Sequence, residues 1–467
     1  MAVFVQIHNQ ERAMRIHLIA IGGAVMHNLA LALQQNGHQV SGSDDEIYDP
    51  ARSRLKARGL LPSSAGWFPE KITPELDLVI LGMHARPGNP ELEKALELGL
   101  PVMSFPEFIG RHAENKTRIV VAGSHGKTTT TSMIMHLLRK AGMDFDYLVG
   151  AQLEGFDTMV RLSDAPYMII EGDEYLSSPI DRRPKFIHYQ PQILVLTGIA
   201  WDHINVFPTF EEYLLQFQKL LDTLPEAASV FYDERDEQLR ALLSDARADL
   251  NVHSYRPLPH NVEAGKTHLL TGDGNTIPLE IFGEHNLANL QAAFLVAMKL
   301  GLAEGKIHEA AASFKGAAKR LQTLAENSSF KAWLDFAHAP SKVAATVKAV
   351  GNLYPERKLT ACVELHTFSS LNKAFLPQYR NTLNAADQAV VFYSPHTLEM
   401  KKMPPISPGE IKTAFDHPNL HVFTKTEDLE AFLRQNEWNG HNLLLMSSGT
   451  FGGLKAGELA EELMKKI

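Results

Sequence analysis

The chain has 467 residues, of which 45% are hydrophobic and 21% are charged, and its formal net charge is -9 at pH 7. This length and ordinary composition predict a globular protein of about three domains. The negative balance argues against nucleic acid as the main partner, because binding a phosphate backbone usually needs a basic surface. The single cysteine, Cys362, excludes an internal disulfide framework and fits a reducing compartment.

Membrane segments are not indicated either. No apolar run approaches the roughly 20 residues that a membrane helix needs. The first residues lack the apolar core and small-residue cleavage site of a secretory signal. We therefore expect a cytoplasmic protein with no membrane partner, and the sequence gives no indication of its oligomeric state.

Strand, turn and helix patterns alternate along the whole chain, and the Val- and Ile-rich runs are too apolar for half-exposed antiparallel strands. This predicts an α/β fold with domains at 1–113, 114–322 and 323–467, the first boundary lying in the polar segment 111–116. The strands are predicted at 15–21, 38–42, 76–81, 119–122, 167–170, 193–196, 331–335, 358–362, 388–393, 420–423 and 442–446, and a long helix at 285–301.

The most informative segment is RIVVAGSHGKTTTT, residues 118–131. It predicts a buried strand, a glycine loop and the start of a helix, an arrangement that holds the phosphates of a nucleotide. Gly123 and Gly126 would allow a close backbone approach, Lys127 would supply a positive charge, and Thr128 would offer a hydroxyl to a phosphate-bound Mg²⁺. The match is G-x-x-G-K-T rather than the full motif, and a simple helix start is the alternative interpretation.

Acidic residues follow the next apolar strand. YMII runs directly into EGDE, so that Glu171 stands at the carboxyl end of a predicted strand, where such sheets bind ligands. A solvated acidic turn is the alternative. The strand ILVLTG similarly precedes Asp202 and His203, although Mg²⁺ prefers oxygen, and from its chemistry alone His203 could equally be an ordinary loop histidine.

Near the start of the chain, HLIAIGGAVMHNLALALQQNGHQVSGSD has the order strand, glycine turn, helix and strand. Gly22 and Gly23 fall in the turn, and Asp44 follows the second strand. The pattern is a degenerate dinucleotide-type fingerprint, which a plain α/β turn would also produce.

Six motifs occur in an order that resembles the Mur ligases of bacterial cell-wall synthesis: GSHGKTTTT, EGDE, WDHINVFP, GEHNLANLQAA, FKGAAKRLQ and LDFAHAP. The resemblance implies a Rossmann-like N-terminal domain that binds a UDP-sugar, a central P-loop ATPase domain with a mostly parallel sheet, and a Rossmann-like C-terminal domain that brings the amine. It also implies ATP and two Mg²⁺ ions as cofactors. ATP would phosphorylate a carboxylate to an acyl phosphate, and the amine would then attack to give an amide, ADP and phosphate.

The resemblance also implies roles for single residues. Lys127 resembles the lysine on the β- and γ-phosphates, Thr128 and Glu171 resemble ligands of one Mg²⁺, and His203 resembles a ligand of the second. Arg320 and Asp335 resemble the residues that close over ATP. The implied ATP contacts are Gly123, Ser124, His125, Gly126, Lys127, Thr128, Thr129, Asn286, Asn289, Arg320 and Asp335. The two asparagines could equally be capping and surface residues, and no role follows for Lys219, which stands near the place of a carbamylated lysine in some members.

The N-terminal pattern and the N-P-E loop resemble members that act on UDP-N-acetylmuramate, which implies contacts from Gly22, Gly23, Ser43, Asp44 and Asn89. One such branch adds the tripeptide L-alanyl-γ-D-glutamyl-meso-diaminopimelate in peptidoglycan recycling, and the other adds L-alanine in de novo synthesis. DLVILGMHARPGNP, RRPKFIHYQPQILVLTGIAWDHINVFPTF and LLMSSGTFGGL resemble the first branch. We therefore expect the tripeptide, with L-alanine as the alternative.

The third domain departs from both branches. It reads Ala337-His338-Ala339-Pro340 where relatives have two histidines, and the loop that contains His366 and Phe368 has no arginine. His338 and His366 are weak candidates for amine contacts and could equally cap or pack. The carboxylates of a tripeptide ordinarily require Arg or Lys, for which Arg380, Lys401 and Lys402 are candidates.

A function of another class is a non-catalytic, nucleotide-binding regulatory protein. Degenerate enzymes typically lose the phosphate lysine or the metal carboxylate, whereas Lys127 and Glu171 are both present here. The sequence therefore favours an active ligase.

Overall fold

The computed structural model describes residues 13–153, 155–201, 206–263, 265–316 and 321–467. These residues fall into two compact units, one within 1–199, 211–256 and 292–302, the other within 200–210, 257–291 and 303–467. Two sheets belong to the first unit and two to the second. No helix among the described residues combines the length and the apolarity that crossing a membrane requires.

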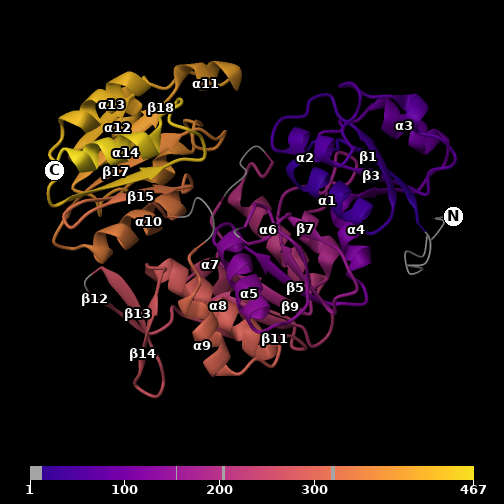
Figure 1. Ribbon diagram of the computed structural model, residues 1–467, viewed down its shortest axis with the longest axis horizontal. Helices are drawn as coiled ribbons and strands as arrows, with labels where there is room; N and C mark the ends of the chain where they lie inside the picture. Colours follow the sequence, from indigo (N-terminus) through magenta and orange to yellow (C-terminus); the bar gives the residue numbers. More distant parts are fainter. Residues whose placement is uncertain (1–12, 154, 202–205, 264, 317–320) are drawn as a thin grey trace. The chain divides into compact units, whose positions relative to one another are not determined.

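The first sheet is built from four parallel strands in the order β2-β1-β3-β4. Figure 1 labels β1 and β3 of this sheet. Its order reverses next to β1, which creates a topological switch point at the carboxyl edge of the sheet. The strands are β1 Arg15–Ile19, β2 Gln39–Ser43, β3 Leu78–Leu81 and β4 Val102–Ser104. The helices are α1 Ala24–Gln35, α2 Ala51–Ala57, η1 Pro69–Lys71, α3 Pro90–Glu97 and α4 Phe105–His112.

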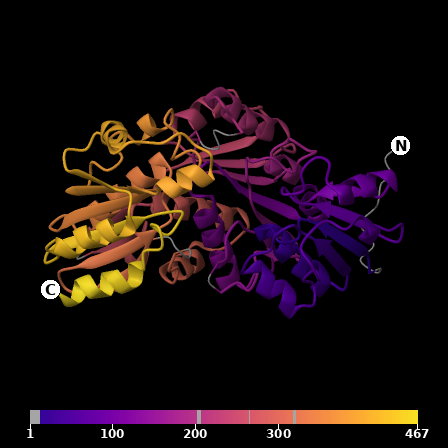
Figure 2. The same cartoon turned by 90° about the horizontal axis from the view of Figure 1, so that it is seen from above.

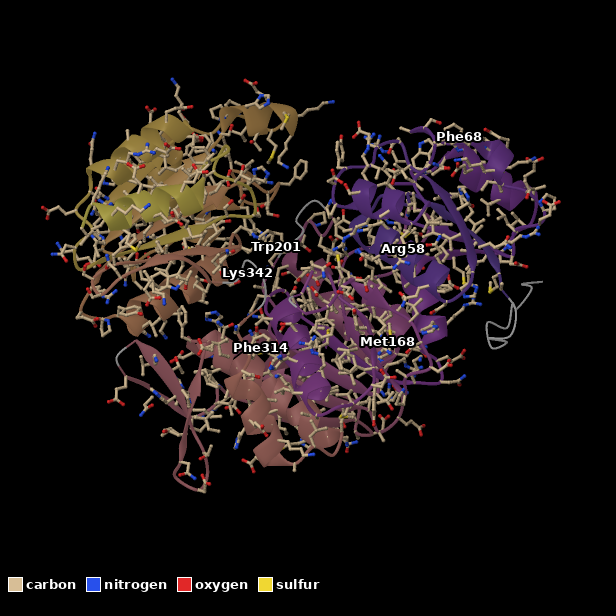
Figure 3. The ribbon with its side chains drawn as sticks, viewed as in Figure 1. Arg58, Phe68, Met168, Trp201, Phe314 and Lys342 are labelled. Carbon is tan, nitrogen blue, oxygen red and sulfur yellow. The ribbon has the colours of Figure 1, made fainter. Side chains whose placement is uncertain are left out.

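The second sheet has seven strands in the order β11-β10-β9-β5-β8-β6-β7, all parallel except β7. Its strands are β5 Thr117–Ala122, β6 Asp146–Leu148, β7 Val160–Arg161, β8 Tyr167–Glu171, β9 Ile193–Leu196, β10 Ser229–Asp233 and β11 Asn251–Tyr255. The helices that follow are α5 Lys127–Lys140, η2 Lys185–Tyr189, α6 Phe210–Asp222, α7 Glu237–Ser244, α8 Glu284–Lys299 and α9 Glu304–Ala312. The central strands are buried, as at Met168 on β8, which Figure 3 labels.

The second unit contains a small antiparallel sheet and a six-stranded sheet. The small sheet joins β12 His260–Glu263, β13 Lys266–Leu270 and β14 Thr276–Leu279. The larger sheet has the order β15-β16-β20-β17-β18-β19 and is parallel except for β15. Its strands are β15 Gln322–Glu326, β16 Lys331–Asp335, β17 Lys358–Leu365, β18 Gln388–Tyr393, β19 Leu420–Phe423 and β20 His441–Met446.

Helices cover both faces of the six-stranded sheet. Successive residues of a strand point to opposite faces of the sheet, so Val363 packs in one core and Cys362 in the other. The helices of the first core are α10 Pro340–Leu353, α11 Pro395–Met400 and α12 Pro408–Phe415, with η3 Leu376–Tyr379. The helices of the second core are α13 Thr426–Gln435 and α14 Ala456–Lys465, at the yellow end of the chain in Figure 2.

The expected α/β class with mostly parallel sheets is confirmed, and each predicted strand is present. The strands predicted at 193–196, 331–335, 388–393 and 420–423 have the predicted bounds, and the others have shifted ends. The predicted helix at 285–301 corresponds to α8, Glu284–Lys299. The antiparallel sheet at 260–279 is absent from the sequence prediction, because its edge strands are short and largely polar. The three domain ranges given by the sequence remain a prediction.

Candidate active site

The glycine loop joins β5 to α5 at the centre of the seven-stranded sheet. Gly123 has φ of +132°, and a Cβ there would lie 2.5 Å from Oγ1 of Thr197, so only glycine fits. Gly126 is the N-cap of α5, and Lys127 and Thr128 open the helix. The loop therefore ends on a helix N-terminus at the switch point of the sheet, an arrangement that binds anions in many α/β proteins.

The ammonium group of Lys127 lies against this loop. Its Nζ donates to the carbonyl oxygen of Gly123 at 2.5 Å and to Oε2 of Glu174 at 2.8 Å. Burial alone would lower the pKa of Lys127, but the carboxylates of Glu174, Asp173 and Glu171 outweigh burial and raise it above its ordinary value. The side chain is therefore a fixed positive charge where a phosphate group would lie.

Thr128 and Glu171 are brought together, as the sequence predicts. β5 and β8 are neighbours in register, with Val121 opposite Glu171, so the end of β8 lies beside the glycine loop. Oγ1 of Thr128 donates to Oε1 of Glu171 at 2.8 Å, and the amide of Gly150 donates to Oε2 at 2.9 Å. Both side chains are thus held at one edge of the sheet.

The donors at this edge suit magnesium. No group of three His, Cys, Asp or Glu side chains among the described residues could hold a metal ion without further ligands. Mg²⁺, however, is commonly bound by only one or two carboxylates together with substrate phosphates and water. A hydroxyl and a carboxylate oxygen at the phosphate loop therefore fit the ion, and Thr128 and Glu171 are the residues that would hold it.

Sequence reasoning missed Tyr213 on α6, which lies at the centre of the hydrogen bonds behind the loop. Its hydroxyl is bonded to Oγ of Ser124 at 2.7 Å and donates to Oε1 of Glu174 at 2.7 Å. An aromatic residue on the buried face of an amphipathic helix is typical of a core position. No local sequence signal would have indicated this contact.

Other loop residues have local roles in the structure. The carbonyl of His125 accepts a hydrogen bond from the hydroxyl of Thr197, and the carbonyl of Thr129 accepts one from Ser132. His203 and Arg320 lie outside the described residues. Lys219 is exposed on α6.

The glycine turn after β1 contacts Asp44 at the end of β2. The amide of Gly22 donates to Oδ2 of Asp44 at 2.7 Å, and Gly23 is the N-cap of α1. Oδ1 of Asp44 is buried and has no hydrogen-bond partner among the described residues. Burial raises the pKa of Asp44 to about 6, and the neighbouring Asp45 adds to the rise, while the Gly22 amide opposes it. The carboxyl group is therefore oriented and has spare capacity for a ligand's donor.

Ser43 is also buried at this edge, next to a lysine that the sequence did not single out. Nζ of Lys71 lies 3.3 Å from Oγ of Ser43 and 4.3 Å from the ring centroid of Phe68, which Figure 3 labels. Lys71 and Phe68 belong to the segment 66–71. The buried carboxylate of Glu91 anchors this segment, because it accepts a hydrogen bond from the backbone amide of Phe68 at 2.7 Å. Lys71 thereby supplies a cation beside the glycine turn.

Asn89 caps helix α3, which packs beside the first sheet. Its Oδ1 accepts hydrogen bonds from the amides of Glu91 at 3.0 Å and Leu92 at 3.1 Å, which caps the N-terminus of α3. The Asn-Pro-Glu pattern is typical of such a cap, with proline at the first helical position. Its predicted contact with a UDP-sugar remains a prediction.

In the second unit, Nδ2 of Asn286 donates to the carbonyl of Phe282 at 2.9 Å, and Asn289 is buried on the same helix. Asp335 ends β16, and its carboxylate accepts the amides of Leu321 and Ala337, each at 2.7 Å. This carboxylate therefore fixes the start of the chain segment that follows residues 317–320.

The two candidate histidines follow two strands of the six-stranded sheet, His338 after β16 and His366 after β17, and β20 lies between these strands. Nδ1 of His338 is bonded to the carbonyl of Phe336 at 2.9 Å, and its own carbonyl accepts the Tyr379 hydroxyl. Nδ1 of His366 lies 3.7 Å from the buried carboxylate of Glu364. The same carboxylate accepts the amide of Phe451 at 2.7 Å, so it anchors the loop after β20 beside His366.

The structure separates the candidate cations of this unit. Arg380 is exposed and donates twice to Oδ2 of Asp416, at 3.1 and 2.8 Å. Nζ of Lys401 lies 4.3 Å from the ring centroid of Phe368, which is half exposed in the loop after β17. Lys401 thus brings a positive charge from the end of α11 to the loop that lacks an arginine, while Lys402 is exposed.

The chain is similar to known proteins over nearly its full length. It matches the Mur ligase middle domain over residues 121–297 and the Mur ligase family, catalytic domain, over residues 15–117. A relative from Escherichia coli (strain K12), named UDP-N-acetylmuramate–L-alanyl-gamma-D-glutamyl-meso-2,6-diaminoheptandioate ligase, is 28% identical and covers 97% of this chain and 99% of its own. A UDP-N-acetylmuramate–L-alanine ligase from Carboxydothermus hydrogenoformans is 31% identical, over 94% of this chain and 95% of its own.

A solved structure shares the fold. The crystal structure of a murein peptide ligase from Psychrobacter arcticus 273-4 matches with a TM-score of 0.63 and 23% identity, covering 97% of this chain and 98% of that chain. At this identity the likeness concerns the fold alone, and the α/β architecture described above agrees with it.

Proposed function

This chain belongs to the Mur ligase family of ATP-dependent amide ligases, and we propose that it joins UDP-N-acetylmuramate to the tripeptide L-alanyl-γ-D-glutamyl-meso-diaminopimelate. The reacting groups are the lactyl carboxylate of the sugar and the amino group of the peptide. The observation that carries the ligase chemistry is the cluster of Lys127, Thr128 and Glu171 at the glycine loop. A role in peptidoglycan recycling follows from the peptide substrate.

The reaction is written in two steps. A carboxylate oxygen of the sugar attacks the γ-phosphorus of ATP, an oxygen–phosphorus bond forms, and the bond to the β-phosphate oxygen breaks to release ADP. The amine nitrogen then attacks the acyl carbon and loses a proton. The carbon–oxygen bond to phosphate breaks, which leaves the amide and inorganic phosphate.

The residues at the loop serve this chemistry through charge. The ammonium of Lys127 and the amides at the start of α5 can neutralise negative charge on the transferring phosphoryl group without reorganising. A bound Mg²⁺, held by Thr128 and Glu171, would supply further charge neutralisation. His203, Arg320 and Asp335 are proposed to complete the site, as are Asn286 and Asn289 for the adenine.

Sugar binding is proposed at the carboxyl edge of the first sheet. Asp44 offers a buried oxygen to a hydroxyl or imide donor, and Lys71 offers a cation to a diphosphate. Gly22 and Gly23, in the turn after β1, and Ser43, at the end of β2, are proposed to complete this site. The free donor capacity of Asn89 beyond its helix cap would serve the same ligand.

The choice of the tripeptide has support from the six-stranded sheet. L-alanine has one carboxylate next to its amine, whereas the tripeptide carries carboxylates further along its chain. Lys401 on the Phe368 ring is a cation suited to such a group. The alternative, addition of L-alanine, is favoured by the second relative, whose identity to this chain is similar.

One experiment decides between these functions. Purified protein is given UDP-N-acetylmuramate, ATP and Mg²⁺ with either L-alanine or the tripeptide, and the product is identified by mass. We expect a product with the tripeptide, and a product with L-alanine alone would overturn the choice of amine. Absence of phosphate release with every amine would instead support a non-catalytic nucleotide-binding protein.

The proposed reaction belongs in the cytoplasm, because ATP and nucleotide-activated sugars are cytoplasmic metabolites. Cys362, the one cysteine of the chain, is a buried free thiol in the core of the six-stranded sheet. Burial raises the pKa of this thiol, which keeps it protonated and unreactive.

A further inference from the structure

Glu174 is a fully buried carboxylate that holds two donors of different kinds. Its Oε2 accepts the ammonium of Lys127 at 2.8 Å, and its Oε1 accepts the hydroxyl of Tyr213 at 2.7 Å. A buried carboxylate is costly unless it is paired and hydrogen-bonded, so both contacts matter for its charged form. Glu174 therefore links the phosphate-loop lysine to a residue on α6.

Tyr213 is rigidly placed to make this bond. Its side chain is fully buried, and its ring packs edge-on against Phe217 with a centroid distance of 5.4 Å. Its hydroxyl also reaches Oγ of Ser124 in the glycine loop at 2.7 Å. The hydroxyl is thus held between Ser124 and Glu174 by contacts that do not involve Lys127.

Nucleotide binding would change the partners of Glu174. The β- and γ-phosphates would take the ammonium of Lys127, because they carry more negative charge than one carboxylate. Glu174 would then lose its ion pair while remaining buried beside an anionic ligand. The Tyr213 hydroxyl is a donor that stays in place and continues to satisfy the carboxylate.

We infer that Glu174 and Tyr213 are positioning residues that form a counter-ion relay for Lys127. Glu174 holds the lysine in the nucleotide-free protein, and Tyr213 stabilises Glu174 when the phosphates take the lysine over. This inference rests on the proposed use of ATP at the glycine loop. It assigns to Tyr213 a role in nucleotide binding rather than in packing alone.

The relay predicts opposite effects for two conservative variants. Tyr213→Phe keeps the ring but removes the donor on which the nucleotide-bound state depends, so the Kd for ATP should rise about tenfold, as for one charge-assisted hydrogen bond. Glu174→Gln removes the negative charge that competes for Lys127, so the Kd for ATP should fall several-fold. Its kcat should nevertheless fall, because Lys127 loses the ion pair with Glu174 that positions its ammonium group.

The measurement is ATP binding by calorimetry, with and without Mg²⁺, together with kcat and KM for the full reaction. Tyr147→Phe is the matched control, because Tyr147 is also a buried tyrosine, on β6, and its hydroxyl lies 3.5 Å from Oγ1 of Thr158, a residue outside the glycine loop. It should leave the Kd unchanged. In the double variant, the effect of Tyr213→Phe should disappear, since no buried charge remains to be stabilised.

Shifts of the Kd in the same direction for both variants, or shifts below twofold, would overturn the relay while leaving the proposed function intact. Should Tyr213→Phe fail to fold, Glu174→Gln decides, because tighter ATP binding does not result from damage to the fold. If the wild-type protein binds no ATP, the proposed function itself is wrong and the relay falls with it.

Discussion

Oγ1 of Thr128 and Oε1 of Glu171 lie 2.8 Å apart, although 43 residues separate them along the chain. Thr128 is on the first turn of α5 and Glu171 ends β8, and the pairing of β8 with β5 brings them together. The contact joins a hydroxyl and a carboxylate oxygen at the phosphate loop, which is the donor pair that Mg²⁺ prefers there.

Replacing Glu171 by Gln tests this pair. The amide keeps the shape of the side chain but removes its charge, so we expect kcat for product formation to fall by about 100-fold or more. The Mg²⁺ concentration needed for half-maximal rate should rise. Glu237→Gln, at an exposed position on α7, is the control. An unchanged Mg²⁺ dependence would contradict the assignment.

Lys127→Ala should abolish phosphate release, because it removes the positive charge that Nζ places beside Gly123. Binding of UDP-N-acetylmuramate should survive, since its proposed site is on the first sheet. Lys140→Ala, at the exposed end of the same helix, should behave like the wild type. Retained turnover in Lys127→Ala would remove the lysine from the mechanism.

The phosphate loop was predictable because its signals are local. An apolar run, a G-K-T triplet and a helical pattern lie next to each other, and the structure places β5, the loop and α5 accordingly. The carboxyl end of β8 was predictable for a similar reason, since Glu171 directly follows a buried strand. The identity of the fold class needed no more than this alternation.

Long-range hydrogen bonds were not predictable in the same way. Tyr213 bonds to Glu174 and Ser124, which lie 39 and 89 residues away along the chain, and its position reads as ordinary helix core. Lys71 had no motif around it at all. By contrast, the helix cap formed by Asn89 does have a local pattern, but its resemblance to a ligand-binding loop suggested another role.

Replacing Asp44 should have two opposite effects, a gain in stability and a loss of affinity for the UDP-sugar, and both should depend on pH. Burial raises its pKa to about 6, so the folded protein binds a proton more readily than the unfolded chain. The cost of the charge therefore grows as the pH rises from the unfolded pKa, about 3.9, to about 6, and is complete above that. Asp44→Asn should therefore raise the free energy of unfolding at pH 8, by about 1–3 kcal/mol. Chemical denaturation at pH 8 and pH 5 measures this gain, which should shrink at the lower pH.

The same variant should weaken UDP-sugar binding. In the wild-type protein the affinity should fall as the pH drops through about 6, because protonation removes the charge of the carboxylate that accepts the ligand's donor. In Asp44→Asn the affinity for the UDP-sugar should be low at both pH 5 and pH 8 and nearly independent of pH between them. Calorimetry between pH 5 and pH 8 tests both statements, and a flat wild-type profile would exclude Asp44 from the sugar site.

Asp146 is a buried anchor for the polar segment that precedes β5. Its carboxylate lies 3.0 Å from Nζ of Lys116 and 3.1 Å from Nε2 of His112, and it accepts the amide of Ser163 at 2.9 Å. Burial would raise the pKa of Asp146, but hydrogen bonds from His112 and Ser163 and the Lys116 ammonium lower it below its ordinary value.

A lowered pKa means that this contribution to stability is present above the pKa of the unfolded chain, about 3.9 for Asp, and is lost as pH falls through the lower folded value. Asp146→Asn leaves the buried ammonium of Lys116 without its counter-charge, with only the carbonyls of Ser163 and Ala165 among the described residues as acceptors, so we expect a loss of about 3–5 kcal/mol at pH 7. Urea denaturation measures it. A loss that is as large at pH 2 as at pH 7 would contradict the electrostatic explanation.

Lys401 is expected to recognise a carboxylate of the tripeptide. The face of the Phe368 ring holds its ammonium at 4.3 Å, which orients the cation at a half-exposed edge without neutralising it. Lys401→Ala should raise KM for the tripeptide about tenfold, as expected for the loss of one charge-assisted hydrogen bond, with little change in kcat. Any turnover of L-alanine should be unaffected, since that substrate has no distal carboxylate.

Two further variants make this test specific. Lys402→Ala removes the adjacent exposed lysine and therefore controls for the general field of a positive charge. Phe368→Leu keeps the apolar contact but removes the aromatic face, so its effect on KM should be in the same direction and smaller than that of Lys401→Ala. Equal effects of Lys401→Ala and Lys402→Ala would mean that a diffuse positive field, rather than an oriented cation, attracts the peptide. The amine specificity would then have to be sought around His366 and the loop that Glu364 anchors.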